Sequence, residues 1–145
     1  MLSRSSALFL ATTCAAALAW SAALAQPAPA ALKPPPEFQS IADPADRSRT
    51  IFAEIGKVLT HPRWGVAPLS MAWEGKSLGD ICRQLKDTAR NGGRDLALLQ
   101  EHVAKDDLVA WGWAPGPGRE PAPGTQEAAG QLVQAWIDSG AECPK

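Results

Sequence analysis

Three side chains in this sequence could ligate an iron atom: His61, Met71 and His102. Haem iron in proteins is held by histidine, or by histidine together with methionine. His61 and Met71 lie in one stretch that prolines and glycines interrupt, "LTHPRWGVAPLSMAWEG" (59–75), and a haem site would pair His61 with Met71 or His102. A histidine at a helix end can instead interact with the terminal carbonyl groups, which is the structural interpretation of His61. His102 is likewise expected to be a partly exposed helix residue, with iron ligation as the alternative.

The sequence contains no recognisable catalytic motif. G-x-S-x-G, H-E-x-x-H, the Walker loop and the dinucleotide-binding fingerprint are all missing from it. Its carboxylates are scattered along segments with helical periodicity, where solvated surface positions are the default. We therefore expect no catalytic residue, no bound metal ion and no independent enzymatic activity.

Tryptophans gather in segments without helical periodicity, and this could reflect a binding surface. Residues 108–125, "LVAWGWAPGPGREPAPGT", carry Trp111 and Trp113 in a long loop, and Trp73 lies in the irregular stretch described above. Indole rings in such a loop either pin it onto the core or form a patch for a partner or ligand. The pair Arg119–Glu120 adjoins them and would belong to the same patch. We expect Trp111 and Trp113 to pin the loop.

The first 25 residues have the features of a signal peptide. Arg4 precedes an apolar run over residues 7–19, and Ala23-Leu24-Ala25 supplies the small residues of a cleavage site. Cleavage would leave a periplasmic or secreted chain with no membrane segment. The formal net charge is −1, or −2 without Arg4, which argues against nucleic acid as a partner.

Export also determines how the cysteines are interpreted. Cys82 and Cys143 are the two that follow the predicted signal peptide. In an oxidising compartment two cysteines favour a disulfide over a zinc site, which would need four ligands. Two unpaired thiols are the alternative.

Hydrophobic spacing predicts an all-α fold, a small bundle of about four helices with one long Pro/Gly/Trp loop. The helical segments begin after Asp43, Ser77, Asp95 and Thr125, each a good N-cap residue. The second segment is expected to continue to Asn91-Gly92-Gly93. Residues 26–42 are rich in proline and alanine and are predicted to be an extended spacer, so the helical domain would comprise residues 43–145.

Three segments of the chain resemble a family of small exported proteobacterial proteins labelled isoquinoline 1-oxidoreductase subunit, which look like c-type cytochromes. These segments are "ICRQLKDTARNGG" (81–93), "WGWAPGPGREPAPGTQ" (111–126) and "AWIDSGAECP" (135–144). In that family the tripeptide HPR runs into a Cys-x-x-Cys-His haem-attachment motif. Here His61-Pro62-Arg63 is followed by Trp64, and the chain has no Cys-x-x-Cys-His.

The resemblance implies a cytochrome c-like scaffold without covalent haem. It implies an exported, non-catalytic accessory or partner of a periplasmic oxidoreductase. The alternatives are an electron-transfer subunit that binds haem non-covalently and a stand-alone module that binds a ligand or peptide.

Overall fold

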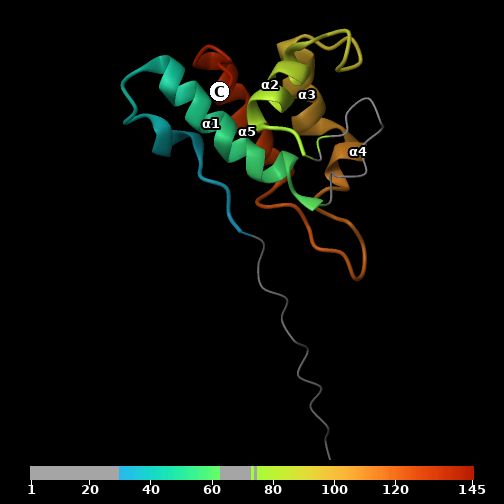
Figure 1. The fold of residues 1–145 in the computed structure, drawn as a ribbon. Coiled ribbons are helices and arrows are strands. Elements are labelled where there is room, and N and C mark those ends of the chain that lie inside the picture. The colour runs from blue at the N-terminus through green and yellow to red at the C-terminus, as the bar shows by residue number, and fades with distance from the viewer. Residues whose placement is uncertain (1–29, 63–72, 74) are drawn as a thin grey trace, which may run out of the picture.

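The computed structural model describes residues 30–62, 73 and 75–145 of this chain, and the described residues are helical with no β-strand. The all-α prediction is therefore confirmed. The predicted signal peptide (1–25) and Met71 lie outside the described residues. Within these described residues, a short 3-10 helix and five α-helices follow in chain order (Figure 1). They are η1 (Pro35–Phe38), α1 (Pro44–Leu59), α2 (Leu78–Lys86), α3 (Leu96–Lys105), α4 (Asp107–Ala110) and α5 (Gln126–Asp138).

The helices begin at the predicted caps. The side chains of Asp43, Ser77, Asp95 and Thr125 each accept a hydrogen bond from a backbone N–H in the first turn of their helix. Pro44 occupies the first position of α1, where its missing N–H costs nothing. Local side-chain chemistry thus sets where four of the helices start.

Helix α5 is the central element of the fold, because α1 and α3 both pack against it. Phe52 of α1 and Trp136 of α5 contact each other with ring centroids 5.1 Å apart. On the other side, Gly130 lets α3 come close, because a Cβ atom there would lie 2.6 Å from the Cβ atom of Ala104. One continuous apolar core results, and it is formed mainly by α1, α2 and α5.

Helix α2 ends earlier than the sequence pattern predicts. It stops at Lys86, and residues 87–93 form turns instead of a further helical turn. The buried side chain of Asn91 explains this, because its amide donates to Leu85 O at 2.6 Å and to Arg94 O at 2.7 Å. Side-chain bonds of this kind offer the backbone an alternative to helix.

The prediction of a spacer over residues 26–42 is wrong for the part that the structure describes. Leu32 and Phe38 are buried in the core, and Gly124 N donates a hydrogen bond to Ala30 O at 3.0 Å. Leu32 lies in a segment without helix, whereas Phe38 is the last residue of the 3-10 helix η1. The part of this segment that the structure describes, residues 30–42, therefore packs with the helical domain.

The predicted disulfide is present between Cys82 of α2 and Cys143 in the C-terminal tail, with Cα atoms 5.6 Å apart. The tail is also held by hydrogen bonds. Ser48 Oγ accepts from Glu142 N at 2.8 Å, and Lys86 Nζ donates to Ala141 O at 2.8 Å. The disulfide thus joins two segments that already pack together.

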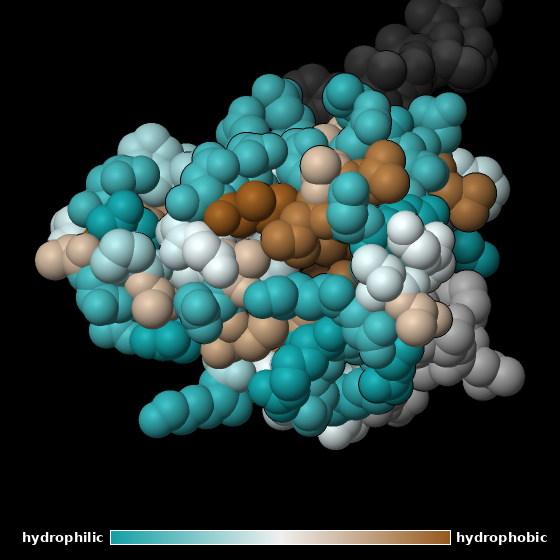
Figure 2. Space-filling view, turned by 90° about the horizontal axis from the view of Figure 1, so that it is seen from above, coloured by the Kyte–Doolittle hydropathy of each residue, from teal (hydrophilic) through white to brown (hydrophobic). Residues whose placement is uncertain are grey.

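The surface of the domain carries both polar and apolar side chains. Polar side chains cover most of the face in Figure 2, and apolar side chains gather in its middle. Within the described residues, no helix combines the length and hydropathy needed to cross a membrane.

Candidate functional site

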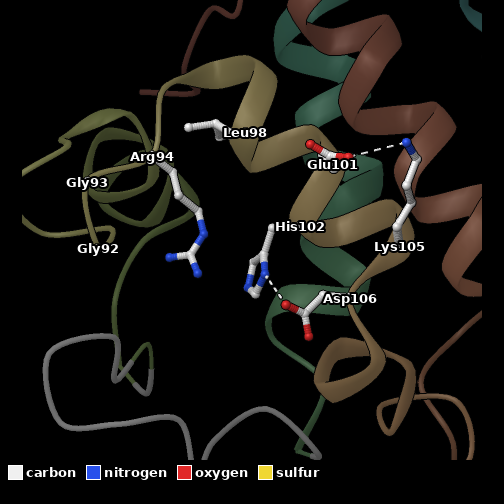
Figure 3. Close-up of a pocket in the computed structure, with 8 residues that line it drawn as sticks. All are labelled: Gly92, Gly93, Arg94, Leu98, Glu101, His102, Lys105 and Asp106. Carbon is white, nitrogen blue, oxygen red and sulfur yellow. Dashed lines mark hydrogen bonds and ion pairs between the residues drawn. The ribbon is translucent and has the colours of Figure 1, made fainter.

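A surface hollow lies between the turn at residues 92–94 and one face of α3 (Figure 3). Its volume is about 430 Å³, within the usual range of small-molecule sites. The α3 residues are spaced three and four apart, so a single helix face presents them to the hollow. The lining residues are Gly92, Gly93, Arg94, Leu98, Glu101, His102, Lys105 and Asp106.

Arg94 is held in place by the buried Asn91. The Asn91 side chain accepts a hydrogen bond from Arg94 N at 2.8 Å and donates one to Arg94 O at 2.7 Å. The guanidinium donates through Nη1 to Asn91 O at 2.9 Å. Gly92 has a positive φ of 80°, and a Cβ atom there would lie 2.6 Å from Arg94 Nη1. The turn therefore both orients the guanidinium and leaves room for it.

His102 is oriented by Asp106. Its Nδ1 lies 3.0 Å from Asp106 Oδ2, while Asp106 Oδ1 accepts the N–H of Leu108 at 2.8 Å. The hydrogen bond from Leu108, and then that from His102, holds the pKa of Asp106 below its usual range. Because the carboxylate is ionised and accepts only, Nδ1 of His102 carries a proton and Nε2 is left for other partners.

The other charged pair at this hollow is weak. Lys105 Nζ lies 3.4 Å from Glu101 Oε1, and both side chains are largely exposed. Solvent-exposed pairs of this type contribute little to stability. Glu101 and Lys105 border the hollow, whereas Arg94 and His102 are the groups available for a ligand.

A second exposed feature lies on the short helix α4. Leu108 is 79% exposed and Trp111, directly after the helix, is 68% exposed. The two positions are three residues apart, so they share one face of α4. We call these two residues the α4 edge. The sequence had assigned Leu108 to a loop without regular structure, but residues 107–110 are helical because Asp106 caps them.

The predicted tryptophan patch is divided by the structure. The expectation that Trp111 pins the loop is wrong, because its ring is largely in solvent. Trp113 does pin the loop, since it packs on the core and its Nε1 donates to Pro123 O at 2.9 Å. Trp73 is 8% exposed and belongs to the core. Arg119 and Glu120 are exposed in the loop that follows.

The structure describes two of the three predicted iron ligands, His61 and His102, and it places them in different parts of the fold. His102 lines the hollow and is bonded to Asp106, whereas His61 follows the end of α1, where its N–H donates to Val58 O at 3.1 Å. The thioether bonds of c-type haem need two free cysteines, and Cys82 and Cys143 are bonded to each other. In residues 30–62, 73 and 75–145, no group of three or more potential metal-binding side chains occurs.

Sequence reasoning missed Arg94, Asp106 and Leu108. A signal for the first was the sequence Asn-Gly-Gly-Arg at residues 91–94, where an asparagine and two glycines favour a tight turn before a cation. A signal for the second was the four-residue spacing of His102 and Asp106 in a predicted helix. The exposure of Leu108 left no signal in the local sequence.

Comparison of the chain with protein-family models, curated proteins and solved structures finds no match.

Proposed function

We propose that this chain is an exported, non-catalytic accessory protein that docks onto a periplasmic oxidoreductase through the α4 edge. The observation that carries the proposal is the exposure of Leu108 and Trp111, at 79% and 68%, on one face of a short helix. Large apolar side chains grouped on a surface are typical of interaction sites. Tryptophan is also among the residues most enriched at the energetic centres of protein interfaces.

The α4 edge is held by a rigid support. Asp106 caps α4, and its backbone oxygen accepts a hydrogen bond from Gln126 Nε2 of α5 at 2.9 Å. Just beyond the edge, Gly112 O accepts a hydrogen bond from Ala122 N at 2.9 Å, and Trp113 is anchored to Pro123. A preorganised surface loses little conformational entropy on binding, which favours affinity.

The nature of the partner rests on the sequence resemblance. The segments at residues 81–93 and 111–126 resemble subunits labelled isoquinoline 1-oxidoreductase, and the second segment begins at Trp111 of the α4 edge. A cytochrome c-like scaffold that lost its haem-attachment segment would keep its docking surface and lose electron transfer. This supports a role in the assembly, stability or positioning of the oxidoreductase.

Co-purification from the periplasm tests this proposal. A C-terminally tagged chain is expressed in its own host, and the retained proteins are identified by mass spectrometry and by cofactor absorbance. We expect an oxidoreductase in stoichiometric amount with the wild type, and its loss with Trp111→Ala or Leu108→Ser. Leu98→Ser is the matched control, because Leu98 is also exposed but lies on α3. Equal retention by all variants, or a stoichiometric partner that is not an oxidoreductase, would contradict the proposal.

A further inference from the structure

We propose that the hollow between Arg94 and His102 binds a small organic molecule with one carboxylate group. The two side chains come from different elements, the turn before α3 and the body of α3 itself. In Figure 3 the guanidinium of Arg94 and the imidazole of His102 extend into the same space. This inference does not depend on the proposed docking function.

The guanidinium of Arg94 supplies the main recognition group. Its one hydrogen bond in the described part of the chain is from Nη1 to Asn91 O, and it forms no ion pair there. The planar guanidinium presents several N–H groups in a geometry that matches a carboxylate. Because Asn91 is buried and fixes both the N–H and the carbonyl of Arg94, the cation is positioned before a ligand arrives.

His102 supplies a second donor when it is protonated. Nδ1 is used by Asp106, so Nε2 remains for the ligand, and it gains a proton as the ring becomes charged. An imidazolium ring loses one of its N–H groups as the pH rises, so this second donor is lost at high pH. The charged groups around it are Arg94, Glu101, Lys105 and Asp106.

The formal charges of these groups favour a single negative charge. Glu101 and Lys105 cancel, and protonated His102 cancels Asp106, so that Arg94 leaves the hollow with one positive charge. With neutral His102 the sum is zero, so binding should weaken as the pH rises. Asp106 is ionised in both cases because its pKa is lowered by its hydrogen bonds to Leu108 and His102.

The rest of the lining fits the organic part of the ligand. Leu98 is 51% exposed and contributes an apolar wall, while Gly92 and Gly93 present backbone without side chains. A bare inorganic anion would use Arg94 but would leave this wall in water. The hollow therefore fits a carboxylate joined to a flat or apolar body.

Benzoate is a direct probe of this site. The mature protein is titrated with benzoate at pH 6, and the imidazole and backbone NMR signals are followed. We expect saturable shifts at His102 and at residues 92–94. We also expect affinity to fall at pH 8, and inorganic phosphate to bind at least about tenfold more weakly than benzoate. The absence of saturable shifts, or stronger binding at pH 8, would overturn the proposal, and equal binding of phosphate would overturn its organic part.

Matched variants locate the binding. Arg94→Gln should weaken benzoate by at least about tenfold, since a hydrogen bond between charged partners is lost, whereas Arg90→Gln in the same turn should not. His102→Gln should remove the pH dependence, and His61→Gln should leave it unchanged.

Circular dichroism of each variant separates lost binding from lost folding, and Arg94→Lys gives a second readout. It keeps the charge without the planar geometry, so it should bind with intermediate affinity. If Arg94→Gln is folded and binds like the wild type, Arg94 is not the recognition group and the proposal fails.

Discussion

Replacing Cys143 by alanine should cost a large part of the stability of this domain. The bond with Cys82 closes a loop with a sequence separation of 61 residues. The entropic model assigns such a loop about 4 kcal/mol of stabilisation at 25 °C, through restriction of the unfolded chain. A domain of this size is typically stable by about 5–15 kcal/mol, so the loss would be a substantial fraction.

The folded state of this variant should remain intact. The tail is still held by the hydrogen bonds that link Glu142 N to Ser48 Oγ and Lys86 Nζ to Ala141 O. Cys143 is only partly buried, so its truncation removes little packing, whereas Cys82 is completely buried. Most of the change in the free energy of unfolding should therefore come from the unfolded state.

Urea unfolding followed by tryptophan fluorescence measures this effect, with intact-mass analysis to confirm the bond. A reductant should lower the unfolding midpoint of the wild type toward that of Cys143→Ala and should leave the variant unchanged. Two results would refute the reasoning. One is alkylation of both Cys82 and Cys143 without prior reduction, which would show free thiols, and the other is an unfolding free energy that Cys143→Ala leaves unaltered.

Three further predictions concern the tryptophans, a buried hydroxyl and haem. Trp73→Ala should cost about 3–5 kcal/mol as a buried aromatic, whereas Trp111→Ala should change the unfolding free energy by less than about 0.5 kcal/mol. Thermal melts decide this, and a large effect of Trp111→Ala would show that its ring is buried. Ser48→Ala leaves Glu142 N without its acceptor and should cost about 1–3 kcal/mol. Urea unfolding measures this cost, with Ser139→Ala as the control, and equal losses of stability in the two variants would contradict the role of Ser48 in holding the tail. The chain should stay colourless when produced with cytochrome c maturation machinery, since Cys82 and Cys143 are joined, and a stoichiometric Soret band lost in His61→Ala would contradict this.

The sequence was most informative where local chemistry determines structure. The caps at Asp43, Ser77, Asp95 and Thr125 were all predicted, because a side-chain oxygen before an amphipathic segment acts within a few residues. The disulfide followed from two cysteines in a chain expected to be exported. Both kinds of inference need little knowledge of the tertiary fold.

The errors arose where tertiary contacts override local pattern. Asn91 and its glycines looked like the end of α2, but the Asn91 side chain stabilises a turn that begins several residues earlier. The proline-rich segment looked like a spacer, yet Leu32 and Phe38 reach the core. The indoles of Trp111 and Trp113 are two residues apart, and only the second reaches the core.

The candidate hollow could not have been predicted as a site. Arg94 and His102 line one hollow although they lie in different elements, and the orientation of each depends on a hydrogen bond to another residue. Periodicity placed His102 on a helix but gave no indication of which cation would face it. The positions of such side chains follow from the turn geometry and not from spacing.

The central claim is tested most directly by the affinity of the chain for the oxidoreductase proposed as its partner, measured by biolayer interferometry with α4-edge variants. Trp111→Ala should weaken binding by about 2 kcal/mol or more, roughly thirtyfold in Kd, as expected for a tryptophan at the centre of an interface. Leu98→Ser, which alters an exposed leucine on α3, should bind like the wild type. A Kd that Trp111→Ala and Leu108→Ser leave unchanged, with both variants folded, would contradict the account.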